Sequence, residues 1–163
     1  MVNNFIPQKD FKKLKDHMES ADFPWYFNPT VVTAPPKIDT YFQFTHFFYR
    51  KGMWCSDHSW VLKPILEKIK PLSILHIKAN LNPRETKHIE HGFHNDFAFT
   101  DNAKITTAIF YVNTNNGYTL FENGDKVKSV ANTWCEFSAT RKHTGSTCTD
   151  EKKRIVINVN FIK

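Results

Sequence analysis

The sequence predicts a mainly β protein in which N-terminal helices pack on one face of a two-sheet structure. Two helix-like segments come first, and short β-rich segments separated by turn residues fill most of the remaining chain. The length of 163 residues suits one domain, which can bury a core without disulfide or metal support. We therefore expect residues 1–163 to form a single domain.

Two segments have the apolar spacing of an amphipathic helix. In residues 8–20, lysine and aspartate separate apolar residues that recur three and four positions apart: Phe11, Leu14 and Met18. Residues 59–69 repeat valine, leucine and isoleucine in the same way. Pro64 must lie in the first turn of this second helix or kink it, because proline has no N–H to donate.

The other segments are expected to be extended. Residues 22–30 contain two prolines and predict an aromatic loop or arm. Strands are expected at 31–36, 41–49 and 72–81, followed by a polar stretch at 82–90. The later strands are expected at 93–99, 104–113, 118–121, 126–130, 133–138, 141–147 and 153–161.

The last of these strands alternates between an apolar face and a mixed face. The apolar face consists of Ile155, Ile157, Val159 and Phe161, and the mixed face of Arg154, Val156, Asn158 and Asn160. We expect the apolar face to meet the helices and Arg154 to point between the sheets. A buried guanidinium needs an anionic partner, and a bound dicarboxylate would supply one.

A second pattern combines two histidines with a carboxylate. His94 and Asp96 are two residues apart in an expected strand, so their side chains should project from one face. His143 follows Asp96 by 47 residues and could complete the set from another strand. Two histidines and one carboxylate form the facial triad that holds non-haem Fe(II) and leaves coordination positions open. His91 is the alternative ligand if the register is shifted.

The order of His94, Asp96, His143 and then Arg154 resembles that of the Fe(II)/2-oxoglutarate-dependent dioxygenases. More narrowly, the chain resembles the small prolyl-4-hydroxylase-like oxygenases encoded by marine tailed phages. The segments that carry this closer resemblance are Asp22–Tyr26, His94–Phe97, Ala108–Asn113, Gly117–Phe121 and His143–Asn160. The resemblance covers residues 22–162 and implies a double-stranded β-helix, or jelly roll.

The resemblance also implies an activity and its cofactors. It implies a dioxygenase that uses Fe(II), 2-oxoglutarate and O₂ to hydroxylate a C–H bond, with release of succinate and CO₂. The iron ligands would be His94, Asp96 and His143, and Arg154 would bind the distal carboxylate of 2-oxoglutarate. Because Val156 replaces a hydroxyl residue that some other branches carry, further hydrogen bonds to 2-oxoglutarate must come from elsewhere. The candidates are Tyr111, Lys78 and Asn80.

The resemblance implies a peptide or protein substrate, with proline as the leading expectation. The net charge of +6 favours anionic partners, so a nucleic-acid-modifying oxygenase is one alternative. That branch normally shows a second arginine six residues after the first, where this chain has Asn160. A non-catalytic jelly-roll binding module is the other alternative, but such a module would not need the triad together with Arg154.

The number of cysteines and the hydropathy of the chain indicate the cellular compartment in which the protein acts. Three cysteines without a CxxC pair favour a reducing environment. No apolar run approaches the length of a membrane span, and the N-terminus shows no secretion signal. We expect the protein to act in the cytoplasm, that of the host cell if it is phage-encoded, and not at a membrane.

Overall fold

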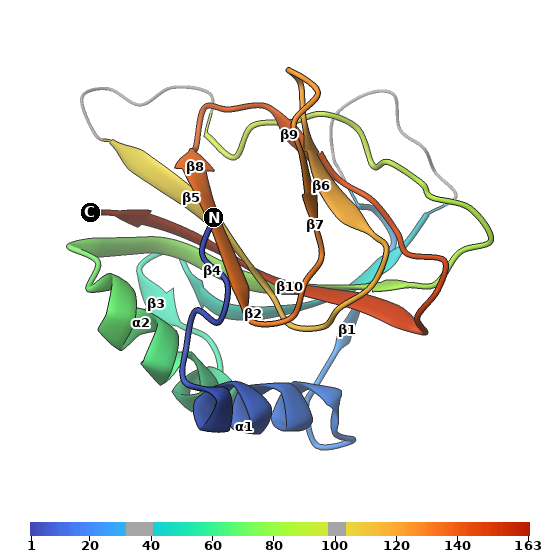
Figure 1. The fold of residues 1–163 in the computed structure, drawn as a ribbon. Coiled ribbons are helices and arrows are strands. Elements are labelled where there is room, and N and C mark those ends of the chain that lie inside the picture. The colour runs from blue at the N-terminus through green and yellow to red at the C-terminus, as the bar shows by residue number, and fades with distance from the viewer. Residues whose placement is uncertain (32–40, 98–103) are drawn as a thin grey trace.

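The computed structural model describes residues 1–31, 41–97 and 104–163 (Figure 1). Its helical elements are α1 (Gln8–Glu19), the 3₁₀ helix η1 (Asp57–Leu62) and α2 (Lys63–Ile69). Its strands are β1 (Tyr26–Asn28), β2 (Gln43–Arg50), β3 (Met53–Trp54), β4 (Ser73–Pro83), β5 (Ile105–Tyr111), β6 (Tyr118–Phe121), β7 (Lys126–Lys128), β8 (Thr133–Ser138), β9 (His143–Gly145) and β10 (Lys153–Ile162).

The strands form two antiparallel sheets. The larger sheet has the strand order β1-β2-β4-β10-β5-β8, with β3 paired to β2, and the smaller one has the order β7-β6-β9. The smaller sheet lies over one face of the larger sheet, and the helices cover the opposite face (Figure 1). This arrangement confirms the predicted jelly roll with N-terminal helices on one sheet.

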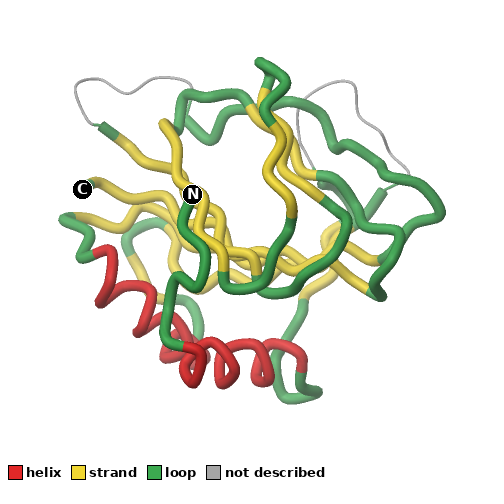
Figure 2. The backbone as a smooth tube through the Cα atoms, viewed as in Figure 1, coloured by secondary structure: helices red, strands yellow, loops and turns green. Residues whose placement is uncertain are grey.

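The hydrophobic core lies between the helices and the larger sheet (Figure 2). As predicted, the alternate residues Ile155, Ile157, Val159 and Phe161 of β10 are fully buried there. They join a cluster that includes Phe11, Leu14 and Met18 from α1 and Ile65 from α2. Within the described ranges, no helix is long and apolar enough to cross a membrane.

The opposite face of β10 is aligned in rows with its two neighbouring strands. The pairing with β4 and β5 places Asn158 between Lys78 and Ile109. One row further along, it places Asn160 between His76 and Thr107. Because alternate residues point to the same face, these rows all project toward the space between the sheets.

The second helix is shorter than the predicted one. Pro64 has no N–H to donate to the carbonyl of Trp60, and the N–H of Lys63 makes that bond instead. A tight 3₁₀ turn therefore precedes α2, and the Ser56 hydroxyl caps it by accepting from the N–H of His58.

The predictions for residues 22–36 had mixed outcomes. The aromatic loop or extended arm predicted for 22–30 is extended in part, because Pro24 and Pro29 flank β1, a short stretch that pairs with β2. The strand predicted at 31–36 falls almost entirely outside the described residues, since 32–40 are not described.

Candidate metal centre and anion pocket

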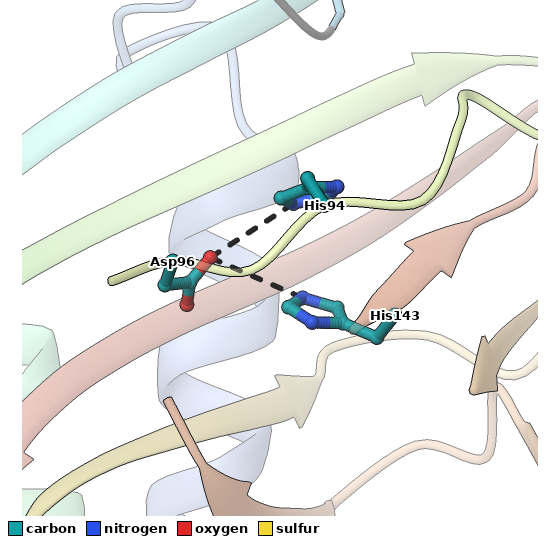
Figure 3. Close-up of side chains that lie close together, drawn as sticks. All are labelled: His94, Asp96 and His143. Atoms are coloured by element: carbon teal, nitrogen blue, oxygen red, sulfur yellow. Dashed lines mark ion pairs between the residues drawn. The ribbon is translucent and has the colours of Figure 1, made fainter. Parts of the chain in front are cut away.

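His94, Asp96 and His143 each bring a potential ligand atom to one point (Figure 3). The Nε2 atom of His94 lies 3.8 Å from Asp96 Oδ1, and that of His143 lies 4.0 Å from the same oxygen. All three ligand atoms lie within 4.8 Å of one another. Ligand bonds of first-row metals are about 2 Å long, so atoms bound to one ion lie roughly 3 to 4 Å apart. The three atoms thus converge to within about 1 Å of the separation that one bound ion requires, and the donor types are those of an Fe(II) facial triad.

The backbone brings the two histidines together through one short β-bridge. His94 and His143 exchange N–H···O bonds of 3.0 and 2.9 Å, and their ring centroids lie 4.6 Å apart. A second bridge joins Glu90 to Ser146. Between the two bridges, the segment from Glu90 to His94 advances four residues while the segment from His143 to Ser146 advances three. The extra residue indicates a bulge. Gly92 lies inside this bulge with a φ of 95°.

The strand predicted for residues 93–99 is therefore wrong over 93–97, and 98–99 lie outside the described residues. The extra residue of the bulge prevents regular pairing on either side of His94. Asp96 lies in a bend that follows His94, and it reaches the common point without the alternation of a strand.

Burial favours the neutral form of two histidines of the pocket, His143 and His91. His143 is only 5% exposed, and burial lowers its pKa, although Asp96 acts in the opposite direction. Burial, with smaller effects of Arg154 and His94, lowers the pKa of His91 to about 4. Lowered pKa values keep both imidazoles neutral at pH 7, and for His143 the neutral form is the one that binds a metal.

Arg154 is a buried cation whose contacts are hydroxyl groups. It is 3% exposed, its Nε donates to Ser129 Oγ at 2.8 Å, and its Nη2 donates to Thr119 Oγ1 at 3.4 Å. Within the described ranges, no carboxylate forms an ion pair with it. An unpaired buried charge is costly, so the guanidinium marks a place for an anion.

One pocket contains the triad, Arg154 and three polar atoms that lack a partner. These atoms are Asn80 Oδ1, Asn82 Nδ2 and His91 Nε2, each buried without a hydrogen bond to the described part of the protein. Buried polar groups are nearly always paired, so a polar molecule in the pocket would supply the missing bonds. A dicarboxylate such as 2-oxoglutarate has suitable oxygen atoms for Arg154 and for the amide of Asn82.

The remaining predicted residues lie at different depths. Lys78 and Asn80 line the pocket, as do His76 and Asn82 on the same strand face. Asn82 was not among the predicted site residues, although the alternation of β4 places it on the face of Lys78 and Asn80. Burial lowers the pKa of Lys78, and the nearby Asp96 opposes this effect.

Tyr111 lies behind the pocket wall. It is fully buried, and its hydroxyl donates to Thr119 Oγ1 at 2.8 Å. Thr119 lines the pocket and also accepts from Arg154, so Tyr111 holds the hydroxyl that contacts the guanidinium. Burial raises the pKa of Tyr111 to about 12, and the phenol therefore remains a hydrogen-bond donor at neutral pH.

The fold is similar to that of several solved structures, although the sequence identities are low. No family model and no curated protein matches the sequence. A Pseudomonas putida prolyl-4-hydroxylase is 13% identical, with a TM-score of 0.57 over 99% of this chain and 90% of the other. A Trichoplax adhaerens prolyl hydroxylase, solved with a hypoxia inducible factor peptide fragment, is 10% identical, with a TM-score of 0.62 over 99% and 81%.

A viral collagen prolyl hydroxylase from Paramecium bursaria Chlorella virus-1 is similar to the same extent. It is 11% identical, with a TM-score of 0.59 over 99% of this chain and 88% of the other. Identities this low establish a shared fold and not a shared reaction. The fold is the jelly roll of these hydroxylases, and the case for an activity depends on the residues of the pocket.

Gly117 gives a test of how tightly Arg154 is held. A β-carbon at this position would lie 2.7 Å from Arg154 Cδ and 2.8 Å from Asn115 Oδ1. Gly117→Ala should therefore displace the arginine and lower the free energy of unfolding by about 1–3 kcal/mol. Gly145→Ala is the matched control, because its β-carbon would lie at an ordinary 3.5 Å from Arg154 Nη1. Urea denaturation of both variants measures the effect, and equal stability would contradict the close contact.

Proposed function

We propose that residues 1–163 form one Fe(II)/2-oxoglutarate-dependent dioxygenase domain of the prolyl-4-hydroxylase-like kind. It would hydroxylate a C–H bond of its substrate and release succinate and CO₂. One observation carries the proposal: the metal-binding triad and a buried arginine without an anionic partner line the same pocket. Neither a binding module nor a structural jelly roll has a need for both features.

The triad would hold the metal, and the surrounding residues would set its environment. His94, Asp96 and His143 supply two imidazoles and one carboxylate, which suit Fe(II). When bound, the iron, 2-oxoglutarate and O₂ supply the oxidising chemistry of the reaction. The protein orients these groups and limits water, partly through Val31, Ile109 and Val156, apolar side chains in the pocket wall.

Arg154 would bind the distal carboxylate of 2-oxoglutarate. Its planar guanidinium suits two parallel hydrogen bonds to a carboxylate, and Ser129 and Thr119 fix its orientation. Tyr111 supports this end of the pocket through Thr119. Lys78 and Asn80 line the wall formed by β4, where they can bind the remaining oxygen atoms of the cosubstrate.

A peptide or protein segment is the proposed substrate, with proline as the proposed target. Three exposed aromatic residues support this choice: Tyr26 is 62% exposed, Phe27 63% and Phe42 43%. Phe27 and Phe42 contact each other with ring centroids 5.4 Å apart, and Phe42 precedes Gln43, which lines the pocket. Exposed aromatic surfaces commonly bind extended, proline-containing peptides. The Trichoplax enzyme, which shares the fold, was solved with a peptide.

The positive charge is the one observation that favours a nucleic acid instead. The net charge of +6 would attract a phosphate backbone. However, Asn160 occupies the position of the second arginine of that branch, and its side chain contacts Asp96. We therefore keep a nucleic-acid substrate as the second candidate.

We also propose that the protein acts in the cytoplasm, that of an infected host if its gene belongs to a phage. The three cysteines, Cys55, Cys135 and Cys148, are free thiols, which agrees with a reducing compartment. The resemblance to oxygenases of marine tailed phages supports a phage origin.

Metal binding should depend on the triad. His94→Ala should weaken the binding of Co(II), a stable substitute for Fe(II), by at least about tenfold, because one of three ligands is lost. His88→Ala is the matched control, since His88 is a nearby histidine that instead contacts the carbonyl of Thr147. Anaerobic titration monitored by visible absorption gives both affinities. Equal affinities for the two variants would contradict the proposed metal centre.

Arg154 should determine the affinity for 2-oxoglutarate and leave metal binding largely intact. Arg154→Ala should weaken 2-oxoglutarate binding by roughly tenfold to a thousandfold, because a charge-assisted pair in a buried site is lost. Arg154→Lys keeps the charge and should have a smaller effect. Calorimetric titration of the Co(II)-loaded protein measures this, with Arg84→Ala, an exposed arginine, as the control. An unchanged affinity in Arg154→Ala would exclude the proposed role.

Succinate release should distinguish the two substrate classes. Proline-containing peptides and oligonucleotides with alkylated bases are compared at matched salt concentration. Peptide-dependent succinate release, with a mass increase of one oxygen atom on the peptide, is the expected result. Turnover with the oligonucleotides alone would overturn the peptide assignment. Alanine in place of Phe27 should reduce peptide turnover more than alanine in place of Leu72, which is 79% exposed.

A further inference from the structure

The two oxygens of the Asp96 carboxylate have different surroundings. Oδ1 faces the histidines, 3.8 Å from His94 Nε2 and 4.0 Å from His143 Nε2. Oδ2 accepts two hydrogen bonds, from Thr107 Oγ1 at 2.8 Å and from Asn160 Nδ2 at 2.7 Å. One oxygen is therefore held by the protein, while the other points to the place of the metal.

The two donors come from adjacent strands of the larger sheet. In the register of β10, Asn160 pairs with Thr107 of β5 on one side and with His76 of β4 on the other. Thr107 is fully buried and Asn160 is 3% exposed. Their positions are thus fixed by the sheet, whereas Asp96 lies on a segment outside it.

Their hydrogen bonds form a closed set around Asp96. Asn160 Nδ2 also lies 2.8 Å from Thr107 Oγ1. A carboxylate accepts hydrogen bonds and donates none, so the amide NH₂ of Asn160 and the hydroxyl of Thr107 both donate to Asp96. The Thr107 oxygen can then accept the other amide hydrogen.

We propose that Thr107 and Asn160 are positioning residues that hold Asp96 through Oδ2, so that only Oδ1 meets the metal. A carboxylate without such donors can rotate and offer either oxygen or both. Two donors on Oδ2 remove this freedom and leave the remaining coordination positions for the cosubstrate and O₂. This inference rests on the proposed function, because it concerns the same metal centre.

The Thr107 position allows a closely matched test. Thr107→Val keeps the shape of the side chain but removes the hydroxyl, and Thr107→Ser keeps the hydroxyl. Thr106→Val is the control for the loss of a hydroxyl, because Thr106 is the neighbouring residue of β5 and points to the opposite face. Asn160→Ala removes the second donor. Circular dichroism and thermal unfolding show that each variant is folded.

Co(II) gives a readout that does not depend on turnover, because its visible spectrum reports the number and arrangement of its ligands. Thr107→Val and Asn160→Ala should each change this spectrum and weaken Co(II) binding by about tenfold to a hundredfold, as is typical when partners of metal ligands are removed. Thr107→Ser and Thr106→Val should keep the affinity and the spectrum of the wild-type protein. If Asn160→Ala does not fold, the comparison of Val with Ser at position 107 decides the question.

The outcomes separate this inference from the proposed function. If His94→Ala loses Co(II) binding while Thr107→Val and Asn160→Ala bind it with the wild-type affinity and spectrum, the positioning role is excluded and the metal centre stands. If the wild-type protein and His94→Ala bind Co(II) equally weakly, the proposed metal centre fails, and the positioning role fails with it. If Thr107→Ser weakens Co(II) binding as much as Thr107→Val does, the hydrogen bond of the hydroxyl is also excluded as the cause.

Discussion

The alternation of side chains along β10 is the constraint on which the rest of the structure depends. One face of this strand supplies four fully buried apolar residues to the core beneath the sheet. The other face supplies Arg154, Val156, Asn158 and Asn160 to the pocket above it. A shift of the register by one residue would exchange the two faces, so the core and the pocket enforce the same pairing. The helices do not line the pocket, but by packing on the apolar face of β10 they help to fix the register that forms it.

The pocket contains opposite charges near the two ends of β10. Arg154 lies at one end, next to the amide of Asn82, and Asn160 lies at the other end, next to the carboxylate of Asp96. The guanidinium is buried among hydroxyl groups, and the described residues provide no carboxylate for it. A ligand that carries negative charge would reduce the cost of that burial. Its binding energy would then add to the stability of the folded chain.

The sequence was sufficient for features that follow from local periodicity. The helix at α1 and the two faces of β10 were predicted because apolar spacing determines them directly. The convergence of His94, Asp96 and His143 was also predicted, but the assumed cause was wrong, since a bulge and a bend replace the strand. Such a bulge depends on pairing with a distant segment, which periodicity cannot reveal. The contacts of Asn160 with Asp96 and of Tyr111 with Thr119 depend in the same way on tertiary packing.

The attachment of Asp96 to β5 and β10 has a mechanical consequence. His143 belongs to β9 in the smaller sheet, whereas Asp96 is tied by hydrogen bonds to two strands of the larger sheet. An ion shared by His143 and Asp96 would be a cross-link between the two sheets, in the way that a disulfide joins distant parts of a secreted protein. The ion would therefore reinforce the backbone bridge between His94 and His143, which already joins the segment of Asp96 to the smaller sheet.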